Sequence, residues 1–122
     1  MNIDAHQHFW KFNPQRDAWI KPDMQVIRRD FLPADLEPLL ESNGIDGCVA
    51  VQADSSLAET HFLLQLAAAT PFIRGVVGWV DLLSADLPKQ LDLLSTHLHL
   101  KGFRHIVQAE PNGFLDNPAF QR

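Results

Sequence analysis

Near the middle of the chain runs the sequence GCVAVQ, residues 47–52, and it decides the fold class. Every position before Gln52 is apolar or glycine, so the stretch lacks the alternation of a strand with one face in water. A short apolar run of this kind is typical of a strand covered on both faces, as in a parallel sheet. Helical patterns lie on either side of it, at residues 33–43 and 56–69. This order predicts a parallel α/β arrangement.

The two flanking helices carry recognisable end signals. Pro33 suits the first turn of the first helix, and Asn43-Gly44 forms a good C-terminal cap. Ser56 is the expected N-cap of the second helix, with Glu59 as its capping-box partner.

Similar apolar runs and helical patterns repeat along the rest of the chain. Further strands are expected at residues 2–5, 73–81 and 98–107, a third helix at 84–97, and the start of a fourth helix around Asn117. Strands that alternate with helices imply βαβ units and one parallel sheet. The stretch at residues 12–32 is longer than a usual βα loop. It is either a functional covering segment or a poorly ordered insertion, and we favour the first.

Composition excludes several classes of function. The 122 residues are 46% apolar and carry a formal net charge of −5 with scattered basic side chains, so we expect one modest soluble core and no nucleic-acid partner. No apolar run is long enough to span a membrane, and no secretory signal pattern opens the chain. The only cysteine, Cys48, lies in an apolar run and reads as a reduced, buried thiol. These features predict a cytoplasmic location.

The chemistry of the opening segment rests on His6 and His8, which stand one residue apart at the end of the first expected strand. Alternate side chains of a strand share a face, so both imidazoles can reach one metal ion. Histidine is the commonest protein ligand for zinc and related ions. The alternative is that one histidine is exposed at the strand end and the other packs.

Five segments in this order resemble the amidohydrolase superfamily, and within it the amidohydrolase-related branch of metal-dependent TIM-barrel hydrolases that includes sugar-acid lactonases. They are IDAHQHFW at 3–10, RDFLPADL at 29–36, VAVQA at 49–53, GVVGWVDL at 75–82 and KGFRHI at 101–106. The resemblance implies the first four βα units of a (β/α)8 barrel, a fold that takes about 250 residues. We therefore expect residues 1–122 to be a single incomplete domain, the N-terminal part of a longer chain.

The resemblance also implies site residues, because catalytic groups of such barrels stand at the carboxyl ends of the strands. His6 and His8 are expected to be catalytic and to hold a divalent metal ion, with zinc the first expectation; in the alternative they only hydrogen-bond substrate. Arg104 is expected to bind substrate, and His105 to bind substrate or carry a proton; alternatively Arg104 pairs with a carboxylate such as Asp81 and His105 caps a loop.

Three further residues at the strand ends are predicted to bind substrate. Gln52 offers a carboxamide for hydroxyl groups, and Trp10 and Trp79 offer flat apolar faces, although a tryptophan buried beneath a loop is the commoner case. Asp54, next to Gln52, either binds hydroxyl groups or caps the turn before Ser56.

The predicted function is hydrolysis of a lactone, of the sugar-acid type, by water activated at the barrel mouth, with a small polar molecule as substrate. The 122-residue chain alone is expected to be inactive. Two alternatives stay open: a metal-independent hydrolase or decarboxylase of the same superfamily, and a non-catalytic half-barrel that binds or assembles, for which self-association is the question.

Overall fold

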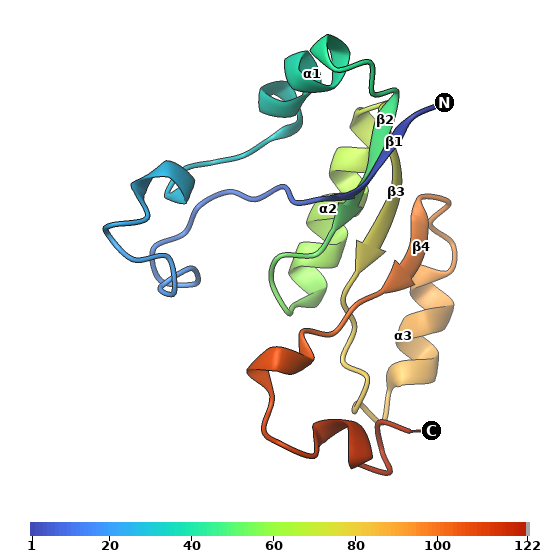
Figure 1. The fold of residues 1–122 in the computed structure, drawn as a ribbon. Coiled ribbons are helices and arrows are strands. Elements are labelled where there is room, and N and C mark those ends of the chain that lie inside the picture. The colour runs from blue at the N-terminus through green and yellow to red at the C-terminus, as the bar shows by residue number, and fades with distance from the viewer. Residues whose placement is uncertain (122) are drawn as a thin grey trace.

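A computed structural model of the chain describes residues 1–121. Its centre is a four-stranded parallel sheet in the order β1-β2-β3-β4, formed by β1 (Ile3–Gln7), β2 (Gly47–Val51), β3 (Ile73–Gly78) and β4 (Leu100–Phe103) (Figure 1). All the predicted strands are present, and the last two end earlier than their apolar runs do. Residues 79–81 and 104–106 leave the sheet and form loops at its carboxyl edge.

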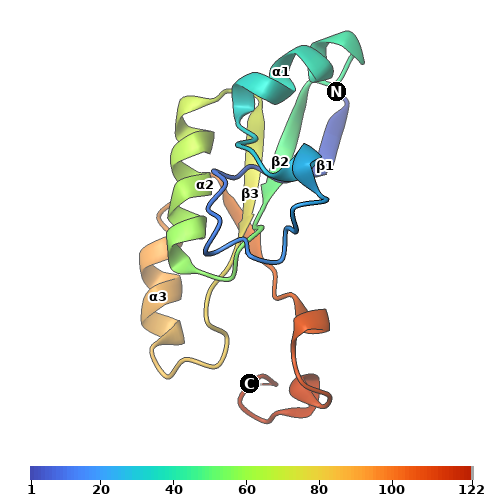
Figure 2. The same cartoon turned by 90° about the vertical axis from the view of Figure 1, so that its left-hand side faces the viewer.

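Three α-helices connect the strands: α1 (Pro33–Ser42), α2 (Leu57–Ala69) and α3 (Leu87–Leu94). Helices α2 and α3 lie on the same side of the sheet (Figure 2). Spatial neighbours in the sheet are also neighbours in the chain. A doubly wound sheet would instead reverse its strand order and place helices on both faces. The arrangement is therefore that of a barrel wall with helices outside.

The core lies between the sheet and α2. Cys48, Ala50 and Val76 from the strands pack with Leu63 and Ala67 of the helix, and each is at most 3% exposed. Cys48 is buried and forms no disulfide, as expected, and burial raises the pKa of its thiol to about 11. The alternate strand residues Val49 and Val77 are only half-buried, because they point to the other face of the sheet.

The ends of α1 and α2 agree with the predicted caps except at one side chain. The Glu59 amide donates to the Ser56 hydroxyl at 3.1 Å, which confirms Ser56 as the N-cap of α2. The Glu59 side chain differs from the prediction: its carboxylate accepts from the Ala53 amide at 3.0 Å and does not close a capping box. The first helix ends as predicted, with Gly44 in the left-handed region at φ 64°.

A buried threonine of α2 ties the helix to the strand ends. The Thr60 hydroxyl donates to the carbonyl oxygen of Trp79 and accepts from the Trp79 amide, both at 2.7 Å. A Cβ on Gly78 would lie 2.7 Å from the Thr60 methyl group, so glycine is required for this close approach. The loop after β3 is thereby fixed against α2.

The long segment between β1 and α1 is ordered rather than a loose insertion. At its base, Trp10 and Phe31 form an isolated antiparallel bridge with main-chain hydrogen bonds of 3.0 and 2.9 Å. The Phe12 amide donates to Asp30, and the Ile20 side chain is only 3% exposed. The segment also contains the short 3-10 helix η1 (Gln25–Ile27).

After β4 the chain forms two short 3-10 helices, η2 (Val107–Ala109) and η3 (Phe114–Asp116). Where a fourth helix was expected, around Asn117, the described residues form only a turn: the Asn117 side chain accepts from the Ala119 amide, and the Gln121 amide donates to the Asn117 carbonyl oxygen. Within residues 1–121, no helix is both long and apolar enough to cross a membrane.

Candidate functional site

The carboxyl edge of the sheet gathers predicted site residues from all four strands. The residue directly after each strand is His8 for β1, Gln52 for β2, Trp79 for β3 and Arg104 for β4. Parallel strands in register bring these positions to one edge, although they are spread over nearly a hundred residues of sequence. Sharing this edge does not bring all four side chains together: Arg104 contacts Gln52, whereas the Trp79 ring lies near His105.

The two histidines of the opening segment converge. The Nε2 atoms of His6 and His8 lie 3.2 Å apart, with the rings nearly perpendicular at 72°. A tetrahedral zinc ion with Zn–N bonds of about 2.0–2.1 Å places two ligand nitrogens about 3.3–3.4 Å apart. The spacing of the pair therefore fits a hydrogen bond between the two imidazoles and is close to that of two ligands of one ion.

The hydrogen bond of His8 fixes its ring, and the surroundings of the ring affect its pKa. Its Nδ1 donates to the carbonyl oxygen of Val51 at 2.8 Å, which leaves Nε2 as the acceptor nitrogen, directed at Nε2 of His6. Burial lowers the pKa of His8, the hydrogen bond to Val51 opposes this, and the charge of Arg104 lowers the pKa further. Both the burial and the nearby guanidinium therefore favour the neutral form of His8. In the part of the chain that the structure describes, no cluster of three histidine, cysteine or acidic side chains forms around the pair.

Arg104 reaches from the end of β4 across the edge of the sheet. Its Nε and Nη2 donate to the side-chain oxygen of Gln52 at 3.1 and 2.6 Å, and Nη2 also donates to the Gln52 carbonyl oxygen at 2.7 Å. Its Nη1 lies 3.4 Å from Nε2 of His6. Gln52 is fully buried and holds the guanidinium beside the histidine pair.

A cleft of about 220 Å³ opens next to this group. Its walls come from the strand ends, from the segment between β1 and α1, and from the start of α2. The lining residues are His8, Trp10, Arg16, Asp17, Trp19, Ile20, Ala53, Asp54, Glu59 and Arg104. The long segment therefore forms one wall of the cleft.

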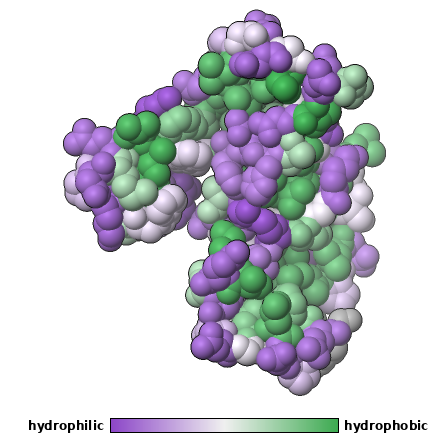
Figure 3. Space-filling view, viewed as in Figure 1, coloured by the Kyte–Doolittle hydropathy of each residue, from purple (hydrophilic) through white to green (hydrophobic). Residues whose placement is uncertain are grey.

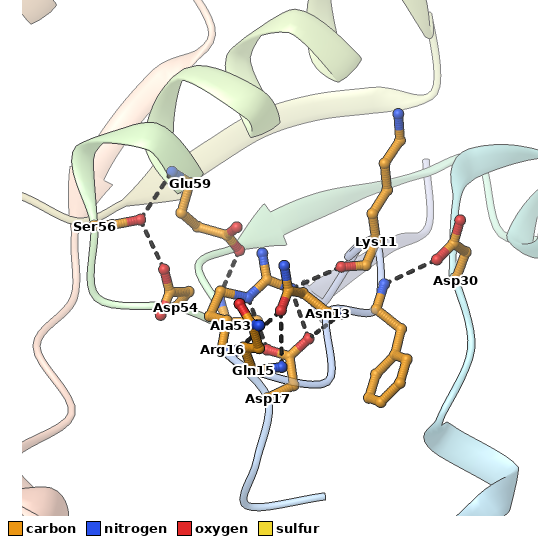
Figure 4. A network of polar contacts seen from close by, with 11 residues as sticks. Lys11, Asn13, Gln15, Arg16, Asp17, Asp30, Ala53, Asp54, Ser56 and Glu59 are labelled. Carbon is orange, nitrogen blue, oxygen red and sulfur yellow. Dashed lines mark hydrogen bonds and ion pairs between the residues drawn. The ribbon is translucent and has the colours of Figure 1, made fainter.

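The wall from the long segment is held by an internal network (Figure 4). Arg16 donates from Nε and Nη2 to the two carboxylate oxygens of Asp17, both at 2.7 Å. The Asn13 amide donates to the same carboxylate at 2.8 Å, and Arg16 also reaches the Lys11 carbonyl oxygen. The hydrogen bonds from Arg16 lower the pKa of Asp17, although burial opposes this.

The wall from α2 is acidic. Glu59 is 4% exposed, and burial is the main cause that raises the pKa of its carboxyl group, against the hydrogen bond from Ala53 and the charge of Arg16. Asp54 accepts from the Ser56 hydroxyl at 2.7 Å, as the turn-capping alternative expected, and it also lines the cleft.

The two predicted tryptophans take different positions. Trp10 lines the cleft, and its buried Nε1 has no hydrogen-bond partner within residues 1–121. Trp79 is not among the lining residues; its ring lies 6.4 Å from that of His105.

His105 points away from the histidine pair. Its Nε2 is 2.7 Å from Glu110, and its ring stacks on Phe114 with centroids 4.9 Å apart. Of these two neighbours, Arg104 contacts Gln52 and His6, whereas His105 contacts Glu110 and Phe114.

Sequence reasoning missed several lining residues. Arg16, Asp17, Trp19 and Ile20 carry no motif; the only signal was the unusual length of their segment. Glu59 was visible only as a helix-capping residue, and its place in the cleft follows from the direction of α2.

Comparison with known proteins covers the whole chain. The amidohydrolase family model matches residues 3–122. An L-fucono-1,5-lactonase of Burkholderia ambifaria is 38% identical over 98% of this chain and 41% of its own length, and one of Burkholderia multivorans is 39% identical over 100% and 42%. The chain thus spans about two fifths of the length of these curated relatives.

Solved structures agree with these matches. A crystal structure of an amidohydrolase from Burkholderia multivorans with bound Zn superposes with a TM-score of 0.93 at 38% identity, covering 98% of this chain and 43% of that one. A second, with bound HEPES, gives 0.94 at 39% identity, covering 100% and 43%. The four βα units described above match this part of a TIM barrel, which confirms the predicted fold class.

Proposed function

Because the chain belongs to the amidohydrolase family, we propose that the intact protein hydrolyses the lactone of a sugar acid. By intact protein we mean the complete barrel, of which we propose that residues 1–122 supply the first four units. One observation carries the proposal: His6, His8 and Arg104 converge at the carboxyl edge of the sheet beside a cleft with polar and aromatic walls. The names of the relatives, L-fucono-1,5-lactonases, support this substrate class.

We propose that His6 and His8 hold a divalent metal ion, zinc in the first instance. The 3.2 Å between their Nε2 atoms and the hydrogen bond from His8 Nδ1 to Val51 support this assignment. The related crystal structure with bound Zn supports the choice of metal. When bound, such an ion supplies a Lewis acid that polarises a carbonyl group.

The other predicted site residues take proposed roles around the same point. Arg104 donates a hydrogen bond to the lactone carbonyl oxygen, where negative charge develops. Trp10 packs on the sugar ring and offers its Nε1 to a hydroxyl group, and Asp54 accepts from another hydroxyl group. The substrate-binding predictions for Gln52 and Trp79 and the catalytic prediction for His105 stand as predictions; for His105, the contact with Glu110 supports a fixed ring orientation.

The first test removes the histidine pair. In the intact protein, His6→Ala combined with His8→Ala should abolish bound metal and lower kcat/KM for L-fucono-1,5-lactone at least about a hundredfold, because two ligands are lost. Metal content is measured by atomic emission and ring opening by proton release. The matched control replaces the exposed His61 and His97 with alanine and should retain both properties.

Two outcomes of this test favour other functions. Wild-type turnover that survives both the double substitution and a chelator would reject the metal-dependent mechanism and favour a metal-independent hydrolase. If the wild type opens no lactone of a sugar-acid panel, the proposed substrate class is wrong, and decarboxylation or a binding role becomes the next hypothesis.

A further inference from the structure

Two arginines line the cleft, and they are held in different ways. Arg16 forms a paired contact with the carboxylate of Asp17 at 2.7 Å, so its charge is compensated. Arg104 instead directs Nε and Nη2 at the single amide oxygen of Gln52, which is neutral. Across the described residues 1–121, no carboxylate oxygen lies within 4.0 Å of an Arg104 nitrogen. Arg104 therefore keeps its positive charge.

The contacts also decide which donors of Arg104 stay free. The hydrogen on Nε and those on Nη2 are used by the side-chain and main-chain oxygens of Gln52. The remaining donors are those of Nη1: one contacts Nε2 of His6 at 3.4 Å, and the other has no partner among the described residues. The Nη1 edge of the guanidinium thus faces the point where the two imidazoles converge.

The oxygens of Gln52 are engaged by Arg104. Gln52 is 0% exposed, and its side-chain oxygen already accepts from Arg104. A buried amide in this place fixes the guanidinium without neutralising it. A glutamate of the same size would make the same contacts and cancel the charge.

From this geometry we propose that Gln52 is a positioning residue whose neutrality matters: it holds Arg104 as an uncompensated cation, with Nη1 directed at negative charge on the reacting carbonyl group. The inference rests on the proposed lactone hydrolysis. Water adds to the carbonyl carbon, and the carbonyl electron pair becomes an oxyanion. Collapse of this intermediate breaks the ring C–O bond. One water proton ends on the released hydroxyl group, and the other leaves as the product acid ionises to a carboxylate.

Both species that Arg104 would recognise, the oxyanion and the product carboxylate, are anions, whereas the lactone itself is neutral. Removing the charge of the site should therefore affect turnover and product binding and leave lactone binding nearly unchanged. If Gln52 had only a structural role, Gln52→Glu should not separate turnover from lactone binding. Glutamate keeps the side-chain and main-chain oxygens that accept from Arg104.

The decisive variant is Gln52→Glu in the intact protein. We expect kcat for L-fucono-1,5-lactone to fall about 10- to 100-fold, KM to stay within about threefold, and the inhibition constant of the ring-opened acid to rise about tenfold. The control Gln65→Glu adds the same charge at an exposed position of α2 and should leave all three values unchanged. Wild-type kcat and product inhibition in Gln52→Glu would overturn the inference.

Gln52→Met covers the case in which the glutamate variant does not fold, as judged by circular dichroism. Methionine has a volume similar to that of glutamine. The substitution leaves the charge of Arg104 in place and removes the side-chain oxygen that positions the guanidinium. We expect kcat to fall at least about tenfold, and wild-type kcat in this variant would overturn the inference.

Acetate separates failure of this inference from failure of the proposed function. It is a carboxylate without a sugar, and its binding, followed by NMR titration, needs no turnover. We expect its dissociation constant to rise at least about fivefold in Gln52→Glu relative to Gln65→Glu. If the wild type opens no lactone but acetate shows this difference, the charged site stands and the lactonase proposal falls. If lactone is hydrolysed but acetate binding is equal in the two variants, the inference falls.

Discussion

Among single residues, Glu59 is the buried carboxylate of the cleft wall. It is 4% exposed, and its partner is the Ala53 amide at 3.0 Å. Burial raises the pKa of this carboxyl group above its ordinary value. The folded protein therefore binds a proton at a pH where the unfolded chain has already released it. Stability must fall as the pH rises from the ordinary glutamate pKa through the raised one.

This predicts the behaviour of Glu59→Gln in the intact protein. The amide retains an oxygen for Ala53 and removes the buried charge, so the free energy of unfolding at neutral pH should be equal to or above that of the wild type. Its decline with rising pH in the weakly acidic range should be smaller. Urea unfolding at several pH values measures both. The exposed Glu41→Gln control should follow the wild type, and a steeper decline in Glu59→Gln would contradict the assignment.

Among the elements, the segment between β1 and α1 is a cleft wall fixed from within. Its base is the bridge between Trp10 and Phe31, and its tip is held by the contacts of Arg16 and Asn13 with Asp17 (Figure 4). The pKa of Asp17 is lowered by Arg16, so this contribution is fully present above the ordinary aspartate pKa. It is lost as the pH falls through the lowered value.

Asp17→Asn should loosen this segment without unfolding the sheet. Losing hydrogen bonds that involve a charged group costs about 1.5–3 kcal/mol, which is about tenfold or more in the local opening equilibrium. Limited proteolysis by trypsin after Lys11, whose carbonyl oxygen accepts from Arg16, and hydrogen exchange of the Asp17 and Ile20 amides report this opening. The exposed Asp23→Asn control should cleave at the wild-type rate. Equal protection in both variants would show that the Arg16 contact does not hold the segment.

For the whole molecule, the sheet of residues 1–121 is covered on one face only. Helices α2 and α3 lie behind it in the view of Figure 1, and Figure 3 shows apolar side chains among polar ones on the face toward the viewer. Val49 and Val77 point to this face and are half-buried. Strands β1 and β4 also each have an unpaired edge within the described residues. Open edges and apolar faces promote association.

Residues 1–122 prepared by themselves should therefore self-associate. Static light scattering should report species well above the 13.8 kDa monomer mass at micromolar concentration. The intact protein gives the comparison, since in a closed barrel every strand has two neighbours. A compact monomer from residues 1–122 would show that the open sheet is tolerated, and would bring the half-barrel hypothesis back into consideration.

The strands, the helices and their order could be predicted from the sequence. The apolar run before Gln52, the N-cap Ser56 and the Asn43-Gly44 stop act over a few residues, so local patterns were enough to place strands and helices. The spacing of His6 and His8 likewise predicted two imidazoles on one face, and their Nε2 atoms lie 3.2 Å apart. The resemblance of five short segments to the amidohydrolase superfamily added the predictions of a barrel fold and of lactone hydrolysis.

Residues that lie far apart in the sequence come together at the site through the tertiary structure. Arg104 contacts Gln52 across 52 positions and His6 across 98, and these contacts depend on strand register, which no local pattern encodes. The places of Arg16 and Glu59 in the cleft depend on the path of a long segment and the direction of α2. Local propensity acts between near neighbours in the chain, whereas the charge and shape of a cleft arise from groups that only the packed sheet brings together.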